Sequence, residues 1–138
     1  MRWMLDTDTC IYFMKHHPPQ VQARLRRVAV GELGISAIVL AELRFGIEKS
    51  QRREDNAAAL ADFLAYCLVL DWPQEATGVY AEIRNDLEAK GTPIGSNDLL
   101  IAAHARHLGC TLVTNNVEEF KRVGGLRIEN WAFGKDEG

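Results

Sequence analysis

Three acidic residues, Asp6, Glu42 and Asp98, each adjoin a run of apolar residues that is a good candidate for the protein core. A buried carboxylate is costly unless a partner compensates its charge. One divalent cation would compensate all three charges, and hard ions such as Mg²⁺ and Mn²⁺ prefer oxygen ligands. The residue types therefore predict a metal-dependent active site in which Asp6, Glu42 and Asp98 are the metal ligands and the catalytic groups.

Asp6 begins the segment Asp6-Thr7-Asp8-Thr9, whose four side chains are all able to cap a helix. A capping role for Asp6 itself is the simplest structural interpretation. Because one helix needs fewer caps than this segment provides, we expect Asp8 or Thr9 to cap the helix and Asp6 to point into a cleft. Thr7 and Asp8 would then support the metal site or position a water molecule.

Glu42 and Asp98 are both expected on helices. All residues three and four positions away from Glu42 are apolar, which predicts that Glu42 lies on the buried side of its helix. A glutamate that extends into solvent or pairs with an arginine is the alternative. A carboxylate near a helix start, such as Asp98, is favourable against the helix dipole in any case. Ser96 and Asn97 are also available as caps, so we expect Asp98 to be a further oxygen ligand.

Short apolar runs alternate with segments of helical periodicity along the chain. Strands are predicted at residues 3–5, 33–35, 68–70, 111–113 and 126–128. Their almost wholly apolar composition is typical of strands that are covered on both faces. Helices are predicted at residues 20–30, 36–49 and 74–90, among others. This alternation predicts an α/β sandwich of three layers, in which helices flank a central parallel sheet of about five strands.

The polar residues that follow these strands are expected to form one rim, because parallel strands end at the same edge of a sheet. They are Asp6, Ser36, Asp71 and the run Thr114-Asn115-Asn116. The three residues of that run would support the metal ligands or position a water molecule. Basic residues flank the rim and could contact phosphate groups. Those singled out are Arg44, Lys49, Lys121 and Arg122.

The composition is typical of one soluble domain. The chain has 138 residues, 47% of them hydrophobic and 25% charged, which suits a single domain with one core. The net charge of −3 gives no general attraction to nucleic acid. No apolar run reaches the about 18 residues of a membrane helix, and Asp6 and Asp8 interrupt any signal peptide. We therefore expect a cytoplasmic protein.

Cysteine and histidine give little support for a zinc site. Cys10, Cys67 and Cys110 lie far apart and are expected as reduced, apolar core residues. His104 and His107 share one helix face, but no further zinc ligands accompany them, so both are expected at the surface.

Five motifs follow one another along the chain. They are Met4-Leu5-Asp6-Thr7-Asp8-Thr9-Cys10-Ile11, Ala41-Glu42-Leu43 with Gly46, the run from Ile94 to Ala102, Thr114-Asn115-Asn116 with Phe120, and Val123-Gly124-Gly125-Leu126 with Trp131. This order resembles the VapC toxins, which are PIN-domain nucleases of bacterial type II toxin–antitoxin modules. The resemblance spans essentially the whole chain. It predicts a PIN domain over residues 1–134, followed by a short tail at residues 135–138.

The resemblance implies a toxic endoribonuclease that uses Mg²⁺ or Mn²⁺, held by Asp6, Glu42 and Asp98. Its substrate would be single-stranded or loop RNA, with tRNA as one candidate, and Arg44, Lys49, Lys121 and Arg122 would contact the RNA backbone. Many PIN domains carry an aspartate where this chain has Asn116. Three carboxylates would then remain, and the neutral oxygen of Asn116 would ligate the metal weakly or position a water molecule.

The resemblance also implies a cognate VapB-type antitoxin. Its tail would cover the acidic cleft, with an arginine against Asp6 or Asp98. An apolar groove formed by residues 38–47, Leu60 and Phe63 would receive the rest of the tail. The helix at residues 74–90 would pair two toxin subunits as a homodimer, within a larger toxin–antitoxin assembly.

Two alternatives come from other classes of protein. A signalling receiver domain has a similar α/β layout and would use Asp71 as phosphate acceptor, beside Asp6 and Asp8. It leaves Glu42 and Asp98 without a role, and a Glu-Asn-Trp sequence stands where its lysine is expected. A catalytically inactive PIN-like binding module is the second alternative, and the three retained carboxylates argue against it.

Overall fold

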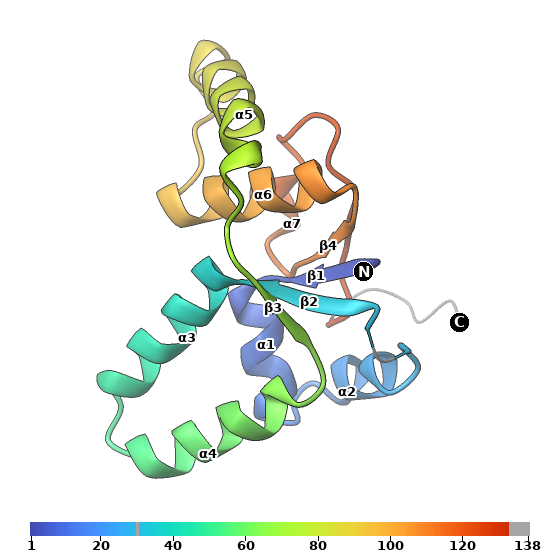
Figure 1. Cartoon of the computed structure of the whole chain (residues 1–138), viewed down its shortest axis with the longest axis vertical. Helices are drawn as coiled ribbons and strands as arrows, with labels where there is room; N and C mark the ends of the chain where they lie inside the picture. Colours follow the sequence, from blue (N-terminus) through green and yellow to red (C-terminus); the bar gives the residue numbers. More distant parts are fainter. Residues whose placement is uncertain (30, 133–138) are drawn as a thin grey trace.

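A parallel sheet of five strands forms the centre of the fold (Figure 1). The strands are β1 (Trp3–Leu5), β2 (Leu33–Ser36), β3 (Leu68–Leu70), β4 (Thr111–Val113) and β5 (Ile128–Glu129). Their order in the sheet is β3-β2-β1-β4-β5. The computed structural model describes residues 1–29 and 31–132, so the predicted tail at residues 135–138 lies outside the described residues. The predicted α/β sandwich with five parallel strands is confirmed.

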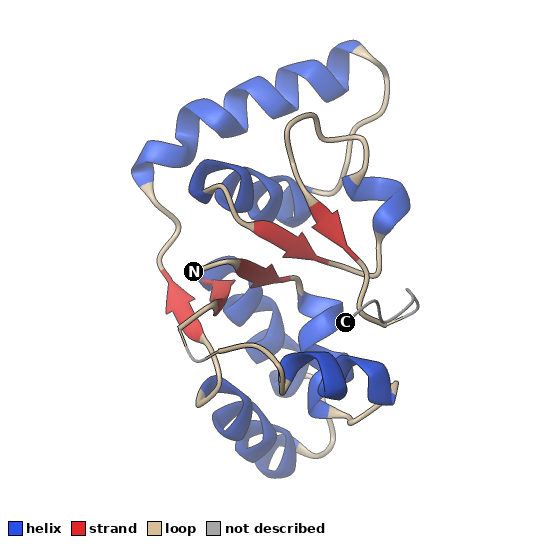
Figure 2. Cartoon of the chain, turned by 90° about the vertical axis from the view of Figure 1, so that its right-hand side faces the viewer, coloured by secondary structure: helices blue, strands red, loops and turns tan. Residues whose placement is uncertain are grey.

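Helices lie on both sides of this sheet (Figure 2). They are α1 (Thr7–Met14), α2 (Pro19–Leu25), α3 (Ala37–Glu48), α4 (Arg53–Leu64), α5 (Thr77–Ala89), α6 (Ser96–Leu108) and α7 (Val117–Phe120), with a short 3-10 helix (Gln74–Ala76) before α5. Among the residues described, none of these helices has the length and apolar character needed to cross a membrane.

Two predicted elements differ from the structure at their ends. The helix predicted over residues 20–30 is wrong for residues 26–29, because α2 ends at Leu25, and residue 30 lies outside the described residues. The amides of Arg27 and Val28 donate to carbonyls three residues back, which tightens the last turn and ends the helix. The last strand is β5 (Ile128–Glu129) rather than residues 126–128, because only Ile128 and Glu129 lie opposite residues of the short strand β4.

The carboxyl ends of β1 and β4 lie at the point where the strand order of the sheet reverses. The chain passes from β1 to β2 on one side of β1 and later returns to form β4 on the other side. Ligands bind at such a switch point in open α/β sheets. Asp6 and Thr114 are the first residues after these two strands, and the amide of Asp6 donates to the carbonyl of Val113 at 3.1 Å. The topology therefore brings the two polar residues to one place.

The edge strand β3 is more exposed than the sequence predicts. Leu5, Ile35 and Leu112 in the middle strands are completely buried, whereas Leu68 and Val69 in β3 are 47% and 41% exposed. The prediction of a strand covered on both faces is wrong for β3, because the helices cover the middle of the sheet and leave this edge partly open.

Asp71, which follows β3, is exposed at the outer edge of the sheet. Strand β2 lies between β3 and β1, so Asp71 does not join Asp6 in the predicted rim. A receiver domain has the strand order 2-1-3-4-5, with the third strand beside the first. The observed order therefore excludes the receiver alternative.

His104 is a core residue, so the prediction of a surface position is wrong. Its side chain is 1% exposed, and Nδ1 lies 2.9 Å from Oγ of Ser36. Helix α6 packs against both α5 and β4, which buries more of α6 than one amphipathic face. Burial, and secondarily the charge of His107, lowers the pKa of His104. His107 is exposed as predicted, and of the cysteines Cys10 and Cys110 are buried.

Candidate active site

Asp6 lies where β1 ends and α1 begins. Its side chain is 5% exposed, and Oδ1 accepts the backbone N–H of Thr9 at 3.0 Å, so Asp6 itself is the N-cap of α1. The prediction that Asp8 or Thr9 takes this role is wrong, because the hydroxyl of Thr9 donates to the carbonyl of Val113 and Asp8 is exposed. Burial raises the pKa of Asp6, and hydrogen bonding by Thr114 and Thr9 offsets part of this rise.

Glu42 lies on α3, whose N-cap is Ser36. The Glu42 side chain is half-buried. Its Oε1 accepts the hydroxyl of Thr7 at 2.5 Å, and its Oε2 accepts the side-chain N–H of Asn97 at 3.3 Å. Glu42 therefore joins the first turns of α1 and α6. Within the described residues no lysine or arginine forms an ion pair with it, so the arginine-paired alternative is not observed.

Asp98 lies in the first turn of α6, three residues after the N-cap Gly95. It is half-buried. Burial, followed by interactions with Glu119, Glu42 and Asp6, raises the pKa of Asp98 from 3.8 to about 7. The same negative charges that make this carboxylate hard to ionise would attract a cation to it.

Glu119 is the site residue that sequence reasoning missed. Its Oε1 accepts the backbone N–H of Gly95 at 2.8 Å, and its Oε2 is hydrogen-bonded to the side-chain amide of Asn116. A Cβ placed on Gly95 would lie 3.6 Å from Oδ2 of Asp98 and 3.8 Å from Oε1 of Glu119, so the two carboxylates flank Gly95. The only signal in the sequence is the spacing of one helical turn between Asn116 and Glu119. The structure thus brings four carboxylates together where three were predicted.

The predicted supporting residues divide into two groups. Thr114 is completely buried, lies against Asp6, and accepts the backbone N–H of Asn116 at 2.9 Å. Asn116 in turn holds Glu119. Asn115 instead donates its side-chain N–H to the hydroxyl of Tyr12 at 3.0 Å. Thr114 and Asn116 therefore belong to the carboxylate cluster together with Thr7, whereas Asn115 is directed to Tyr12. Asp8 is exposed and acts on Asp6 only through its charge.

The four basic residues predicted to contact phosphates lie in different surroundings. Lys121 pairs with Glu118 at 2.7 Å, and Arg122 donates to a carbonyl in the loop before α6 at 3.3 Å. Arg44 and Lys49 are exposed on α3 and at its end. Within the described residues none of the four forms an ion pair with a carboxylate of the cluster.

The donor set of the cluster fits a hard divalent cation. Asp6, Glu42, Asp98 and Glu119 offer carboxylate oxygens only, which are the ligands that Mg²⁺ and Mn²⁺ prefer. One oxygen of Asp6 accepts the capping N–H of α1, and the carboxylate is also hydrogen-bonded by Thr114, so a cation would share Asp6 with these contacts. In the described part of the chain, no three acidic, histidine or cysteine side chains are already positioned to hold a metal ion together. Metal binding would therefore require the carboxylate side chains to rearrange.

The metal-free protein is expected to lose stability as the pH rises from about 4 to about 7. The pKa of Asp98 is about 7 in the folded protein and near its usual 3.8 when unfolded, so the folded state binds more protons across this interval. The expected result in thermal unfolding without metal is a midpoint that falls over this range. Asp98→Asn should flatten the curve, and Mn²⁺ should raise the midpoint most at pH 8. A wild-type curve parallel to that of Asp98→Asn would contradict this assignment.

Comparison with known proteins identifies the family. The sequence profile of the PIN domain matches residues 3–126. Ribonuclease VapC2 from Rickettsia felis is 46% identical over 132 residues, which cover 95% of this chain and 98% of that protein. The chain belongs to the VapC family of PIN-domain ribonucleases.

Further VapC relatives agree over almost the same length. The tRNA(fMet)-specific endonuclease VapC of Shigella flexneri is 42% identical, with 96% of this chain and 99% of that protein covered. The crystal structure of VapBC2 from Rickettsia felis bound to a promoter DNA fragment contains a chain that superposes with a TM-score of 0.88 and is 43% identical, over 95% of this chain and 99% of that one. The predicted VapC resemblance and the PIN-like fold are thus confirmed, and the inactive-module alternative is not favoured.

Proposed function

We propose that this VapC protein is the toxin of a toxin–antitoxin module and that it cleaves RNA as a Mg²⁺- or Mn²⁺-dependent endoribonuclease. The observation that carries the proposal is the cluster of Asp6, Glu42, Asp98 and Glu119 at the switch point of the sheet, with no basic side chain paired to it in the described residues. The ribonuclease and tRNA(fMet)-specific endonuclease names of the relatives support RNA as the substrate. Initiator tRNA is therefore the first target to test.

In this proposal Asp6 and Asp98 hold the cation, and Glu42 and Glu119 complete its acidic surroundings. A cation held by these carboxylates would supply charge stabilisation to the scissile phosphate and would make a nearby water molecule more acidic. Thr7 keeps Glu42 in position through their hydrogen bond, while Asn116 keeps Glu119 beside Gly95. Single-stranded or loop RNA suits such an open site, because its bases are accessible for recognition.

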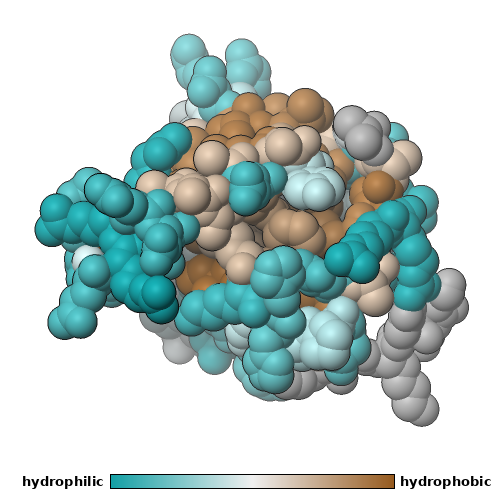
Figure 3. Space-filling model, turned by 90° about the horizontal axis from the view of Figure 1, so that it is seen from below, coloured by the Kyte–Doolittle hydropathy of each residue, from teal (hydrophilic) through white to brown (hydrophobic). Residues whose placement is uncertain are grey.

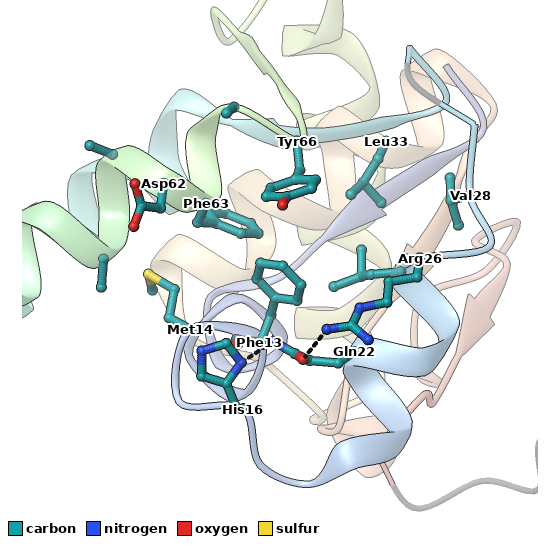
Figure 4. A pocket seen from close by; sticks show the side chains of 14 residues that line it. Phe13, Met14, His16, Gln22, Arg26, Val28, Leu33, Asp62, Phe63 and Tyr66 are labelled. Carbon is teal, nitrogen blue, oxygen red and sulfur yellow. Dashed lines mark hydrogen bonds between the residues drawn. The ribbon is translucent and has the colours of Figure 1, made fainter.

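The partner in this proposal is a VapB-type antitoxin, as in the VapBC2 complex of the Rickettsia felis relative. A cavity of about 540 Å³ lies between the end of α1, α2 and α4 (Figure 4). Its walls include the apolar side chains of Phe13, Met14, Leu25, Phe63 and Tyr66. Seen from below, the molecule carries apolar surface surrounded by hydrophilic side chains (Figure 3). An apolar segment of the antitoxin would occupy this cavity.

The cavity differs from the groove that the sequence predicts. Phe63 belongs to both, but residues 38–47 and Leu60 do not line the cavity. Arg26 and Gln22 lie at its margin (Figure 4), so a carboxylate or backbone carbonyl of the antitoxin would bind there. The antitoxin tail would continue to the acidic cluster, where an arginine would compete with the cation for Asp98.

Assembly and location follow from the same proposal. Two copies would associate through α5, whose outer residues are largely exposed, to give a homodimer within a larger toxin–antitoxin complex. Since cellular RNA is cytoplasmic in bacteria, the proposal includes a cytoplasmic location.

Induced expression of the wild-type protein alone is expected to arrest growth and to produce discrete RNA fragments, because its cleavage activity is unrestrained. Asp6→Asn, produced at an equal level, should permit growth and leave RNA intact. Co-expression of the antitoxin encoded beside the gene should restore growth and yield a co-purifying complex. Growth rate, RNA sequencing of the 5′ ends and affinity purification measure these outcomes. Equal growth of wild type and Asp6→Asn with intact RNA in both would contradict the proposal.

A further inference from the structure

Phe45 lies three residues after Glu42 and is one of the apolar residues from which the sequence predicts a buried helix face. In the structure its side chain is nevertheless exposed. Its side chain is 64% exposed, the largest value among the exposed large hydrophobic residues of the described chain. Val39 and Leu43, which face the core from the same helix α3, are 0% and 4% exposed. Core packing therefore does not explain an aromatic ring at this position.

Phe45 lies on the same side of α3 as the acidic cluster. At about 100° per residue, Glu42, Phe45 and Lys49 fall within about 60° of one another around the helix axis. Arg44 lies about 160° from Glu42 and so belongs to the opposite side of α3. Along the axis Phe45 lies about 4.5 Å and Lys49 about 10 Å beyond Glu42. A carboxylate, an aromatic ring and an ammonium group thus follow one another outward from the cluster.

Lys49 adds positive charge beside the exposed ring. Its Nζ lies 5.0 Å from the centroid of the Phe45 ring. Lys49 is exposed, and within the described residues it forms no ion pair with an acidic side chain. An exposed ring next to an uncompensated cation is the arrangement with which proteins bind single-stranded nucleic acid, since the ring stacks on a base and the cation contacts a phosphate.

We propose that Phe45 and Lys49 form a nucleotide subsite next to the acidic cluster. A base of the RNA substrate stacks on Phe45, and Lys49 contacts the backbone phosphate of the same or the next nucleotide. This inference rests on the proposed ribonuclease function. The distance of Lys49 from Glu42 assigns the subsite to a neighbouring nucleotide rather than to the scissile phosphate. Because every base has a stacking face, the subsite contributes affinity and register more than base identity.

The charge of the surface favours RNA over a purely apolar partner. The protein as a whole has a net charge of −3, and Lys49, which pairs with no acidic side chain in the described residues, places a positive charge close to the acidic cluster. A second toxin copy or an antitoxin seated on Phe45 would gain from the ring but not specifically from the Lys49 ammonium group. The effect of Lys49→Ala and the subunit mass therefore distinguish bound RNA from a second toxin copy or an antitoxin.

Steady-state cleavage of a short single-stranded RNA tests the subsite. Phe45→Ala is expected to raise KM about tenfold with little change in kcat, because a stacked base supplies binding rather than chemistry. Phe45→Trp should restore the wild-type KM. Lys49→Ala should also raise KM. It should reduce the slope of the RNA binding constant against salt concentration, on logarithmic axes, by the amount that about one phosphate contact contributes. Leu108→Ala and Lys15→Ala, exposed residues at the far ends of α6 and α1, are the matched controls and should behave like wild type.

A fluorescent base gives an independent measurement. With 2-aminopurine placed at successive positions of the RNA, one position near the cleavage site should be quenched by wild type and Phe45→Trp but not by Phe45→Ala. An unchanged KM for Phe45→Ala would overturn the proposed nucleotide subsite. So would a change in subunit mass, measured by light scattering, that accounts for the loss of activity of Phe45→Ala. Absence of RNA cleavage by the wild type would instead refute the ribonuclease function itself, so the two failures are separable.

Discussion

Asp6→Asn and Asp98→Asn are each expected to lower the rate of RNA cleavage by at least about a hundredfold. Substitution of residues that only support metal ligands already costs about 10- to 100-fold, and these two carboxylates are the best placed to hold the cation. Asparagine keeps the shape of the side chain and removes its charge. The fold should persist in Asp6→Asn, because asparagine caps helices as well as aspartate and can accept the Thr9 N–H of α1.

Single-turnover cleavage of an end-labelled RNA at saturating Mn²⁺ measures this loss. Glu54→Gln is the matched control, because Glu54 is an exposed acidic residue on α4, outside the cluster, and its removal should leave the rate unchanged. EDTA should abolish cleavage by the wild type. Wild-type rates in either aspartate variant, or cleavage that persists in EDTA, would rule out the assigned metal site.

Glu119→Gln is expected to reduce cleavage by about 10- to 100-fold, the range found when groups around a metal are altered. The substitution keeps one oxygen that can accept the Gly95 N–H, and a flip of the Asn116 side-chain amide lets its oxygen accept the new N–H, so the change removes charge and keeps both contacts. In the absence of metal the same change should lower the pKa of Asp98, since Glu119 is the largest contributor to its elevation after burial. Asn116→Ala should reduce cleavage less, because it removes a contact to Glu119 and no charge.

The neighbouring residue provides a close comparison. Glu118 is exposed and pairs with Lys121, so Glu118→Gln should leave both cleavage and metal affinity unchanged. Mn²⁺ titration calorimetry of the two variants, combined with cleavage rates, separates a loss of metal from a loss of chemistry. Equal behaviour of Glu119→Gln and Glu118→Gln would show that Glu119 lies outside the functional site.

The sequence by itself was sufficient for the parts of the protein that depend on local patterns. Short apolar runs between amphipathic segments predict the five-stranded parallel sheet, because burial on both faces requires apolar strands. Asp6, Glu42 and Asp98 stand out because each interrupts or adjoins an apolar run, where an uncompensated charge is costly. The motifs around them were also enough to recognise the VapC family, which the comparisons confirm.

Only the tertiary structure decided which distant residues meet and which apolar residues remain exposed. Glu119 joins the cluster because the N–H of Gly95 and the amide of Asn116 hold it there, a contact between α6 and α7 that no local pattern encodes. His104 is buried because α6 packs on two sides, and Phe45 is exposed because no element of the described chain covers its part of α3. Helical periodicity predicts that residues share a face, but packing partners determine whether that face is buried. The physical reason is that burial depends on contacts between elements far apart in the chain, whereas patterning reports only each element's own sequence.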